Sequence, residues 1–367
     1  MKLKKTLRPL IIGYVFALCA VLQPLHAIEI ADLYEGKVAL DVDAADQNIA
    51  YQQALRQVLI KLAGRESVES NNSLKRAVSD AQNYLSGYRF SSVDGQNYLF
   101  ATFESAKVDT LLQQSQASIW GKYRPLITIW MIDEQGNDRQ MIADSHPLFS
   151  QQIKQAFAQR GIKVNFPLMD LTDAMDVSVD DVWGRFADNI QRASARYMAE
   201  AVMVLRVSDS TLVEEPDIAV CGQLCAQQSV ASDWLLWGDE LLLQNKRAGN
   251  DKLALLDQVV DDVAEALHQK FGVIVNSQNR FYVDIEIVNV SSMKTFVAVR
   301  QLFASLNLVS DVTLIRAEGD TMLFRLQTMA DNKAIMQALS LESNLLLNHD
   351  PLAELDKQQP VSFFWKG

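Results

Sequence analysis

The sequence predicts a mixed α/β and α+β protein built from three units. We expect an N-terminal α+β unit, a central three-layer α/β unit with an antiparallel extension, and a C-terminal ferredoxin-like unit. Two observations lead to this prediction: the length suits two or three domains, and strand-like runs alternate with helical periodicities along the whole chain. The predicted boundaries are 28–118, 119–275 and 281–349, followed by a tail at 350–367.

Residues 1–27 have the pattern of a secretory signal peptide. Lys2, Lys4, Lys5 and Arg8 precede an apolar run that is shorter than the roughly 20 residues that a membrane span needs. We therefore expect a periplasmic protein with no membrane span after removal of the signal. Whether this segment is cleaved or kept as an N-terminal anchor stays open.

The charge of the chain is strongly negative. The formal net charge is −11, and removal of the four cationic residues of the leader leaves 30 basic against 45 acidic residues, or −15. Nucleic acids and anionic lipid surfaces bind basic patches. We therefore expect neither as a partner.

The N-terminal unit begins with a strand-like stretch, "IEIADLYEGKVALDVD". An amphipathic helix follows, whose apolar stripe consists of Tyr51, Ala54, Leu55, Val58, Leu59 and Leu62. Gly64 fits a helix C-terminal cap, and a second helix is expected near 74–86. The Asp94-Gly95 pair predicts a hairpin, and "KVDTLLQQSQ" predicts a short helix.

The central unit alternates strands and helices. "LITIWMI" predicts a buried strand, followed by a helix at 149–160, the strand "IKVNF", a helix at 179–199 and the strand "AVMVLRVS". This order is typical of a three-layer α/β unit with right-handed crossovers. Two strands that look antiparallel, "SVASDWLLW" and "ELLLQN", then precede the amphipathic helix "LALLDQVVDDVAEALHQKF".

The C-terminal unit follows the polar linker at 276–280. Its pattern fits most of a ferredoxin-like split βαβ. The expected elements are a strand at 281–289, a helix at 292–305, strands at 309–317 and 320–327, and a helix at 331–340. The tail "QQPVSFFWKG" is interpreted as a strand or flap that folds back on the body, or as a docking peptide.

The sequence offers no convincing catalytic or metal-binding constellation. Asp144, Ser145 and His146 are adjacent and therefore cannot form a relay among themselves, so helix capping is the simpler interpretation. His146, His268 and His349 lie in three different segments, and His268 falls near a helix end, where the helix dipole favours a cation. We predict no catalytic residue, no metal site and no cofactor.

An acidic row stands out in the central unit, consisting of Asp170, Asp173, Asp176, Asp180 and Asp181. These residues are interpreted as turn and helix-start residues, with a divalent-ion site as the alternative. Together with Arg196, Asp170 and Asp173 form the candidate functional surface.

Cys221 and Cys225 are four positions apart in "CGQLC". The spacing differs from the C-x-x-C of redox pairs, and a zinc site would need two more ligands nearby. In an oxidising compartment the two thiols are expected to form a local disulfide, with a redox role as the alternative.

Four stretches resemble a family of secreted proteobacterial envelope proteins known only as a domain of unknown function, twenty-sixty-six in that series. They are "DLYEGKVALDVDAADQNIAYQQALRQVLIKLAGRE", "YRPLITIWMIDEQGNDRQMI", "FPLMDLTDAMDVSVDDVWGRF" and "ASARYMAEAVMVLRV". The resemblance implies an envelope location and carries over no catalytic or binding residue. The two cysteines do not look like part of the shared pattern.

These observations favour a non-enzymatic periplasmic protein that binds or scaffolds another envelope component, either a protein or a peptidoglycan-linked one. Two alternatives remain. One is a periplasmic enzyme whose site, at the C-terminal edge of the central strands, uses Asp170, Asp173 and Arg196. The other is a small-ligand sensor that acts through the C-terminal unit.

Overall fold

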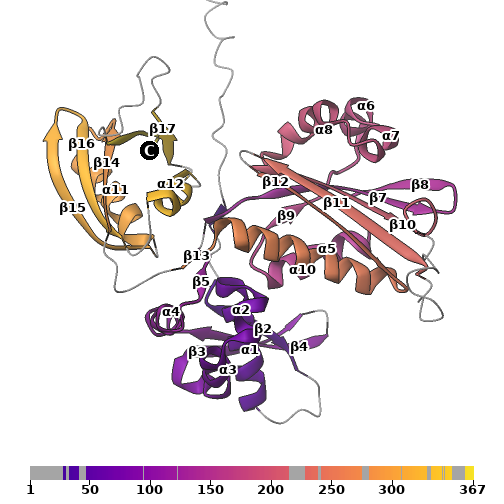
Figure 1. The fold of residues 1–367 in the computed structure, drawn as a ribbon, viewed down its shortest axis with the longest axis horizontal. Coiled ribbons are helices and arrows are strands. Elements are labelled where there is room, and N and C mark those ends of the chain that lie inside the picture. Colours follow the sequence, from indigo (N-terminus) through magenta and orange to yellow (C-terminus); the bar gives the residue numbers. More distant parts are fainter. Residues whose placement is uncertain are drawn as a thin grey trace, which may run out of the picture.

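The computed structural model contains the three units that the sequence predicts, arranged around the long helix α10 (Figure 1). The residues that it describes are 28–29, 33–40, 47–93, 95–121, 123–214, 228–238, 241–274, 281–306, 308–328, 332–340, 342, 344–348 and 360–367.

The N-terminal unit packs helices against one face of a three-stranded antiparallel sheet of order β2-β4-β3. Its elements are β2 (Glu35–Ala39), α1 (Gln47–Ala63), α2 (Arg65–Ser70), α3 (Asn72–Ser79), η1 (Ala81–Tyr84), β3 (Leu85–Val93), β4 (Gln96–Phe103) and α4 (Ser105–Gln114). The predicted apolar stripe of α1 is buried along its whole length. A side chain at Gly36 would collide with the backbone of Ala54, so β2 and α1 lie in backbone contact.

The central unit is a three-layer α/β structure. Its elements are β7 (Ile127–Gln135), β8 (Asp138–Ile142), α5 (Phe149–Gln159), β9 (Val164–Asn165), α6 (Leu171–Asp176), α7 (Val179–Trp183), α8 (Ala187–Ser194), η2 (Ala195–Tyr197), β10 (Ala201–Ser208), β11 (Val230–Gly238), β12 (Leu241–Gly249) and α10 (Lys252–Phe271). The sheet has the order β12-β11-β10-β7-β8, and β9 pairs with the start of β7. β7 runs parallel to β9 and β10, whereas β11 and β12 form the predicted antiparallel extension.

Side-chain alternation on β7 separates two cores. Ile127, Ile129 and Met131 face α5 and α10, whereas Trp130 and Ile132 face α6, α7 and α8. Because both faces are covered, every residue of β7 except Gln135 is buried, and the run Ile129–Ile132 is wholly apolar. Figure 1 shows the two helical layers on opposite sides of the sheet.

Several local details differ from the sequence prediction. The helix expected near 74–86 is present as α3 and η1, and it ends before β3 begins at Leu85. The single helix expected over 179–199 is divided into α7, α8 and η2, because Arg185 adopts a left-handed backbone conformation with φ of 58°. The apolar strand expected after Pro125 continues into a hairpin with β8, whose turn contains Gly136 with φ of 60°. Gly136 followed by Asn137 is a hairpin signal in the sequence.

The C-terminal unit has the strand and helix order expected of a ferredoxin-like unit. Its elements are β14 (Phe281–Val288), α11 (Met293–Ser305), β15 (Val309–Glu318), β16 (Thr321–Thr328), α12 (Asn332–Ser340), β17 (Leu345–Leu347) and β18 (Val361–Trp365). They form a five-stranded sheet of order β15-β16-β14-β18-β17. The aromatic tail is a strand of this sheet, with Phe363 and Trp365 in its core.

Arg124 joins the N-terminal unit to the central unit. Its side chain, 1% exposed, donates hydrogen bonds to the carbonyl oxygens of Lys61, Trp120, Gly121 and Arg160. Two of these carbonyls belong to helix C-termini, where unpaired carbonyls and the helix dipole both favour a cation. The guanidinium therefore fixes the end of α1 against the end of α5.

Two short strand pairs close the same joint. β1 (Ile28–Glu29) pairs with β6 (Tyr123–Arg124), and β5 (Ser118–Ile119) pairs with β13 (Val273–Ile274). The chain thus enters and leaves the central unit beside Arg124.

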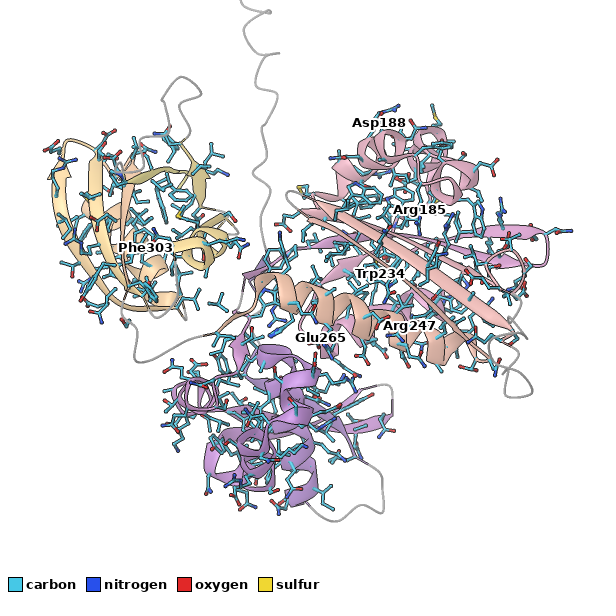
Figure 2. The ribbon with its side chains drawn as sticks, in the orientation of Figure 1. Arg185, Asp188, Trp234, Arg247, Glu265 and Phe303 are labelled. Atoms are coloured by element: carbon cyan, nitrogen blue, oxygen red, sulfur yellow. The ribbon has the colours of Figure 1, made fainter. Side chains whose placement is uncertain are left out.

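Carboxylates of α10 complete the contact between the two units. Glu265 accepts a hydrogen bond from the backbone N–H of Arg65, the first residue of α2, and from the side chain of Arg160. Asp261 forms ion pairs with the same two arginines. Figure 2 shows Glu265 where α10 meets the N-terminal unit.

His268 is buried at this joint and is 4% exposed. Burial first, and then the positive charges of Arg124 and Arg160, lower its pKa from 6.5 to about 4, although a backbone contact with Ser118 opposes the shift. The expectation that His268 acts as a cation at a helix end is therefore wrong, because burial and, after it, the charges of Arg124 and Arg160 lower its pKa.

Among the described residues, no helix combines the length and the apolar character that a membrane crossing requires.

We expect Arg124→Ala to lower the free energy of unfolding by about 3 kcal/mol, because several buried carbonyls lose their donor. Chemical denaturation followed by tryptophan fluorescence measures this loss. Arg325→Ala is the matched control, since Arg325 forms an exposed bidentate ion pair with Asp284, and its loss should cost less than about 1 kcal/mol. Equal losses for the two variants would contradict the role of Arg124.

Stability should also depend on pH through His268. Between pH 6.5 and 4 the unfolded chain binds a proton at this imidazole that the folded chain does not bind. The free energy of unfolding should therefore be undiminished above pH 6.5 and fall by up to about 3 kcal/mol as the pH drops to 4. Urea denaturation across this range should show a shallower pH dependence for His268→Gln. An identical dependence would rule out this contribution.

Candidate functional site

A helical cap consisting of α6, α7, α8 and η2 covers one face of the central sheet (Figure 1). Its contact with the sheet is apolar, through Trp130, Ile132, Val177, Val182, Ile190, Ala193, Val202 and Val204. One buried polar link fixes its position: the indole N–H of Trp130 donates to Ser194 Oγ at 2.8 Å, and this hydroxyl donates to the carbonyl of Ile190 at 2.7 Å.

The structure brings together the three residues of the candidate surface. Arg196 forms a bidentate pair with Asp170, at 2.7 and 2.9 Å, and also donates to Asp173 Oδ1 at 3.0 Å. Asp170 is the N-cap of α6 and accepts the N–H of Asp173. The first turn of α6 is thereby tied to η2.

Asp173 is fully buried at the centre of this cluster. Its Oδ2 accepts the phenol O–H of Tyr197 at 2.5 Å and the N–H of Met169 at 2.9 Å. The Tyr197 oxygen in turn accepts the N–H of Leu168. Met169 has φ of 55°, a conformation that costs about 1 kcal/mol or more for a residue with a Cβ. The buried carboxylate therefore holds a strained turn in place.

The electrostatics of the cluster favour fixed charges. Hydrogen bonding from Arg196, and then from the N–H of Asp173, lowers the pKa of Asp170 to about 2. Burial, together with the hydrogen bond to Asp173, raises the pKa of Tyr197 to about 12. At neutral pH Asp170 stays ionised and Tyr197 stays protonated, so these two groups suit a structural brace better than proton transfer.

The cluster joins the segment that follows β9 to the segment that precedes β10. Arg196 precedes the first residue of β10, whereas the C-terminal ends of β7 and β10 carry Glu134 and Ser208. Glu134 Oε2 accepts the hydroxyls of Ser208 and Thr211, each at 2.5 Å, and Arg139 pairs with Oε1. Burial opposes its charge, but these partners lower the pKa of Glu134 to about 2. The polar groups around Glu134 at the C-terminal ends of β7 and β10 are therefore bonded to one another.

Exposed apolar side chains flank Asp170 and Arg196 along the chain. Leu171 and Met175, one turn apart on α6, are each 77% exposed. Leu168, Phe186 and Met198 are also exposed large apolar residues. We call Leu168, Leu171, Met175 and Met198 the apolar rim, because the bonds from Asp170 and Leu168 to η2 bring these segments together.

A cluster that the sequence analysis missed lies under α7. Trp183 has the guanidinium carbon of Arg139 3.9 Å, and that of Arg206 5.1 Å, from its ring centroid. Arg206 also makes a bidentate pair with Asp233 on β11, and Arg185 pairs with the same carboxylate at 2.8 Å. The sequence contains a signal for this cluster: Arg206 and Asp233 are charged residues within the largely apolar strands β10 and β11.

The acidic row proves to be made largely of helix-start residues. Asp170 caps α6, and Asp181 forms a capping box with Ser178 at the start of α7. Within the described parts of the chain, no group of three or more His, Cys, Asp or Glu side chains is arranged to hold a metal ion.

The remaining predicted residues have local roles or fall outside the described residues. His146 Nδ1 accepts the N–H of Phe149 at 3.1 Å and its ring stacks on that phenyl group, so His146 helps to start α5. Cys221 and Cys225 lie outside the described residues. Their disulfide stays a prediction.

We expect Asp173→Asn to destabilise the cap by about 2–4 kcal/mol, because an amide would place donors against the N–H of Met169. Hydrogen exchange of α6 and η2 should quicken, and the denaturation midpoint should fall. Asp188→Asn is the control, since Asp188 lies exposed on the same cap and should change stability by less than about 0.5 kcal/mol. Unchanged exchange in the Asp173 variant would contradict the brace.

Comparison with known proteins places only the N-terminal part of the chain. No curated protein matches it. The chain matches an uncharacterised family, so that part of the sequence-based resemblance is confirmed. The matching family has a different number from the one named from the sequence. A proteobacterial origin and secretion stay predictions. Residues 27–121, which include the N-terminal unit, match the family described as a domain of unknown function (DUF8605).

Proposed function

We propose that this protein is a non-enzymatic, periplasmic binding protein that docks another envelope component on its helical cap. The observation that carries the proposal is the apolar rim, which lies beside a polar cluster whose groups bond to one another. The leader-like pattern of residues 1–27 supports the periplasmic location.

The apolar rim has the character of a contact surface. Exposed apolar side chains bordered by polar groups are typical of protein interaction sites, and Met is an adaptable contact residue. The brace around Asp173 holds the rim in one conformation, which lowers the entropy lost on binding. A rigid apolar surface of this kind suits a protein partner.

Charge specifies the partner further. Asp176, Asp180 and Asp188 are exposed on the cap, and no cation of the described residues lies within ion-pair distance of them. Arg196, in contrast, is neutralised by Asp170 and Asp173. The exposed carboxylates outnumber Arg192, an exposed cation of the cap that donates to Asn189. The cap therefore has apolar groups and an excess of negative charge, which fits a partner segment that has an apolar face and basic flanks.

The other hypotheses from the sequence receive less support from the contacts. The enzyme hypothesis needs groups that can react with a substrate, whereas Asp170, Asp173 and Arg196 bond to one another. The sensor hypothesis needs a ligand site in the C-terminal unit, where β18 fills the sheet between β14 and β17. A peptidoglycan-linked partner would bind through polar groups, whereas the rim is apolar.

The proposal predicts that Leu171→Ser with Met175→Ser weakens partner capture by at least tenfold, because both side chains would be central contacts. A photo-activated crosslinking residue at position 168 should yield a discrete protein adduct in intact envelopes, and the double variant should abolish it. Asp176→Lys with Asp180→Lys should reduce the adduct as well.

Leu242→Ser is the matched control, because Leu242 is 74% exposed on β12, outside the cap. It should leave the adduct unchanged. An adduct that survives the cap variants, or that Leu242→Ser removes equally, would contradict docking on the cap. An adduct with glycan strands instead of protein would favour the peptidoglycan alternative.

A further inference from the structure

The C-terminal sheet has a strand where its topology does not require one. α12 connects β16 to β17, and a crossover of this kind joins parallel strands. β17 would therefore pair directly with β14, in the antiparallel direction. Instead β18 lies between them, parallel to β14 and antiparallel to β17. The end of the chain is thus inserted into a slot between two strands.

The slot binds β18 by its backbone on both sides. Residues 361–364 are in register with 285–288 of β14, and residues 363–365 with β17. Three further hydrogen bonds, each of 2.9 Å, hold β18 at its ends. Asn348 N–H donates to the Ser362 carbonyl, Lys366 N–H donates to the Asn344 carbonyl, and Asn289 Nδ2 donates to the Trp365 carbonyl. Such strand addition takes its affinity from main-chain hydrogen bonds.

Alternate side chains of β18 supply specificity. Phe363 and Trp365 are 2% and 5% exposed and belong to the core of the unit, together with Ile287 and Phe324. Phe364 points to the other side and is 40% exposed. The slot therefore accepts a strand with aromatic residues at two alternate positions.

The connection between β17 and β18 is much longer than their pairing needs. The two strands are adjacent and antiparallel, an arrangement that a hairpin loop of about two to five residues closes. Here residues 348–360 separate them. Thirteen residues can span up to about 40 Å when extended, which is enough for the strand to reach a neighbouring molecule.

We propose that β18 is exchanged between two copies of this chain, so that each C-terminal sheet is completed by the terminal strand of the other. The exchanged strand makes the same backbone and side-chain contacts as it does within one chain, so exchange loses no interaction. Among the described strands β17 pairs with β18 alone, so each sheet needs a β18 strand in the slot, either its own or that of the second copy. This interface is separate from the helical cap and does not rest on the proposed function.

Mixed crosslinking tests the exchange. Leu346 and Phe364 are directly paired and both exposed, so their replacement spares the core. Full-length Leu346→Cys and Phe364→Cys variants, with the native cysteines replaced by serine, are co-expressed with different tags so that exchange can occur during folding. A short thiol crosslinker should then yield a heterodimer that carries both tags.

Two controls make each result decisive. The double variant Leu346→Cys with Phe364→Cys should crosslink within or between chains, because the pair is adjacent in either arrangement. Leu346→Cys co-expressed with Leu171→Cys, whose thiol lies on the cap, should yield less than a tenth of the heterodimer. Exchange is overturned if the mixed pair gives no heterodimer while the double variant crosslinks internally, or if the cap control gives an equal amount. Failure of the double variant to crosslink would overturn the slot itself.

Discussion

The buried guanidinium of Arg124 is the contact on which the arrangement of the N-terminal and central units depends. It bonds to carbonyls from α1, from the connecting segment and from the end of α5, so three parts of the chain converge on one planar group. A lysine has three donors on one nitrogen, whereas Arg124 uses three separate nitrogens to reach its four carbonyls. Gly161, with φ of 69°, leaves the space that this group occupies, since a Cβ there would lie 3.1 Å from Arg124 Nη1. With Arg124 in place, α10 can offer Asp261 and Glu265 to the N-terminal unit.

The same joint positions the candidate site through the sheet. β7 begins three residues after Arg124, and its Trp130 reaches the cap through the hydroxyl of Ser194. η2 follows at once and supplies Arg196 and Tyr197, which hold the first turn of α6. The strand β7 therefore connects the joint to the cap, where the Trp130–Ser194 bond and the Arg196 pairs fix the position of the helices. The exposed apolar rim is found on this cap, on a support that leaves it little freedom to collapse.

Much of the fold can be predicted from periodicity because burial imposes it. The stripe of α1, the long helix α10 and the strands of the C-terminal unit follow their predicted ranges closely. The division at Arg185 depends on a tertiary contact, its pairing with Asp233 about fifty residues away, and local pattern does not contain it. Asp170, Asp173 and Arg196 could be grouped from composition, but Tyr197 could not be assigned as the partner of Asp173. The partners of Arg124 are carbonyls, which every residue has, so no residue type in the sequence marks them.

The two proposed surfaces have opposite physical characters, and they would act together. The slot of the C-terminal sheet fits β18, from the same chain or, in the proposed exchange, from a second copy. The rim of the cap is exposed, and the partner proposed for it has an apolar face and basic flanks. An exchanged dimer carries two caps in one particle, and binding of the first raises the effective concentration for the second. A rim of four apolar side chains, weak by itself, could then hold a partner that repeats or that lies at high density in the envelope. Dimerisation through β18 would thus increase avidity without adding a contact to the cap.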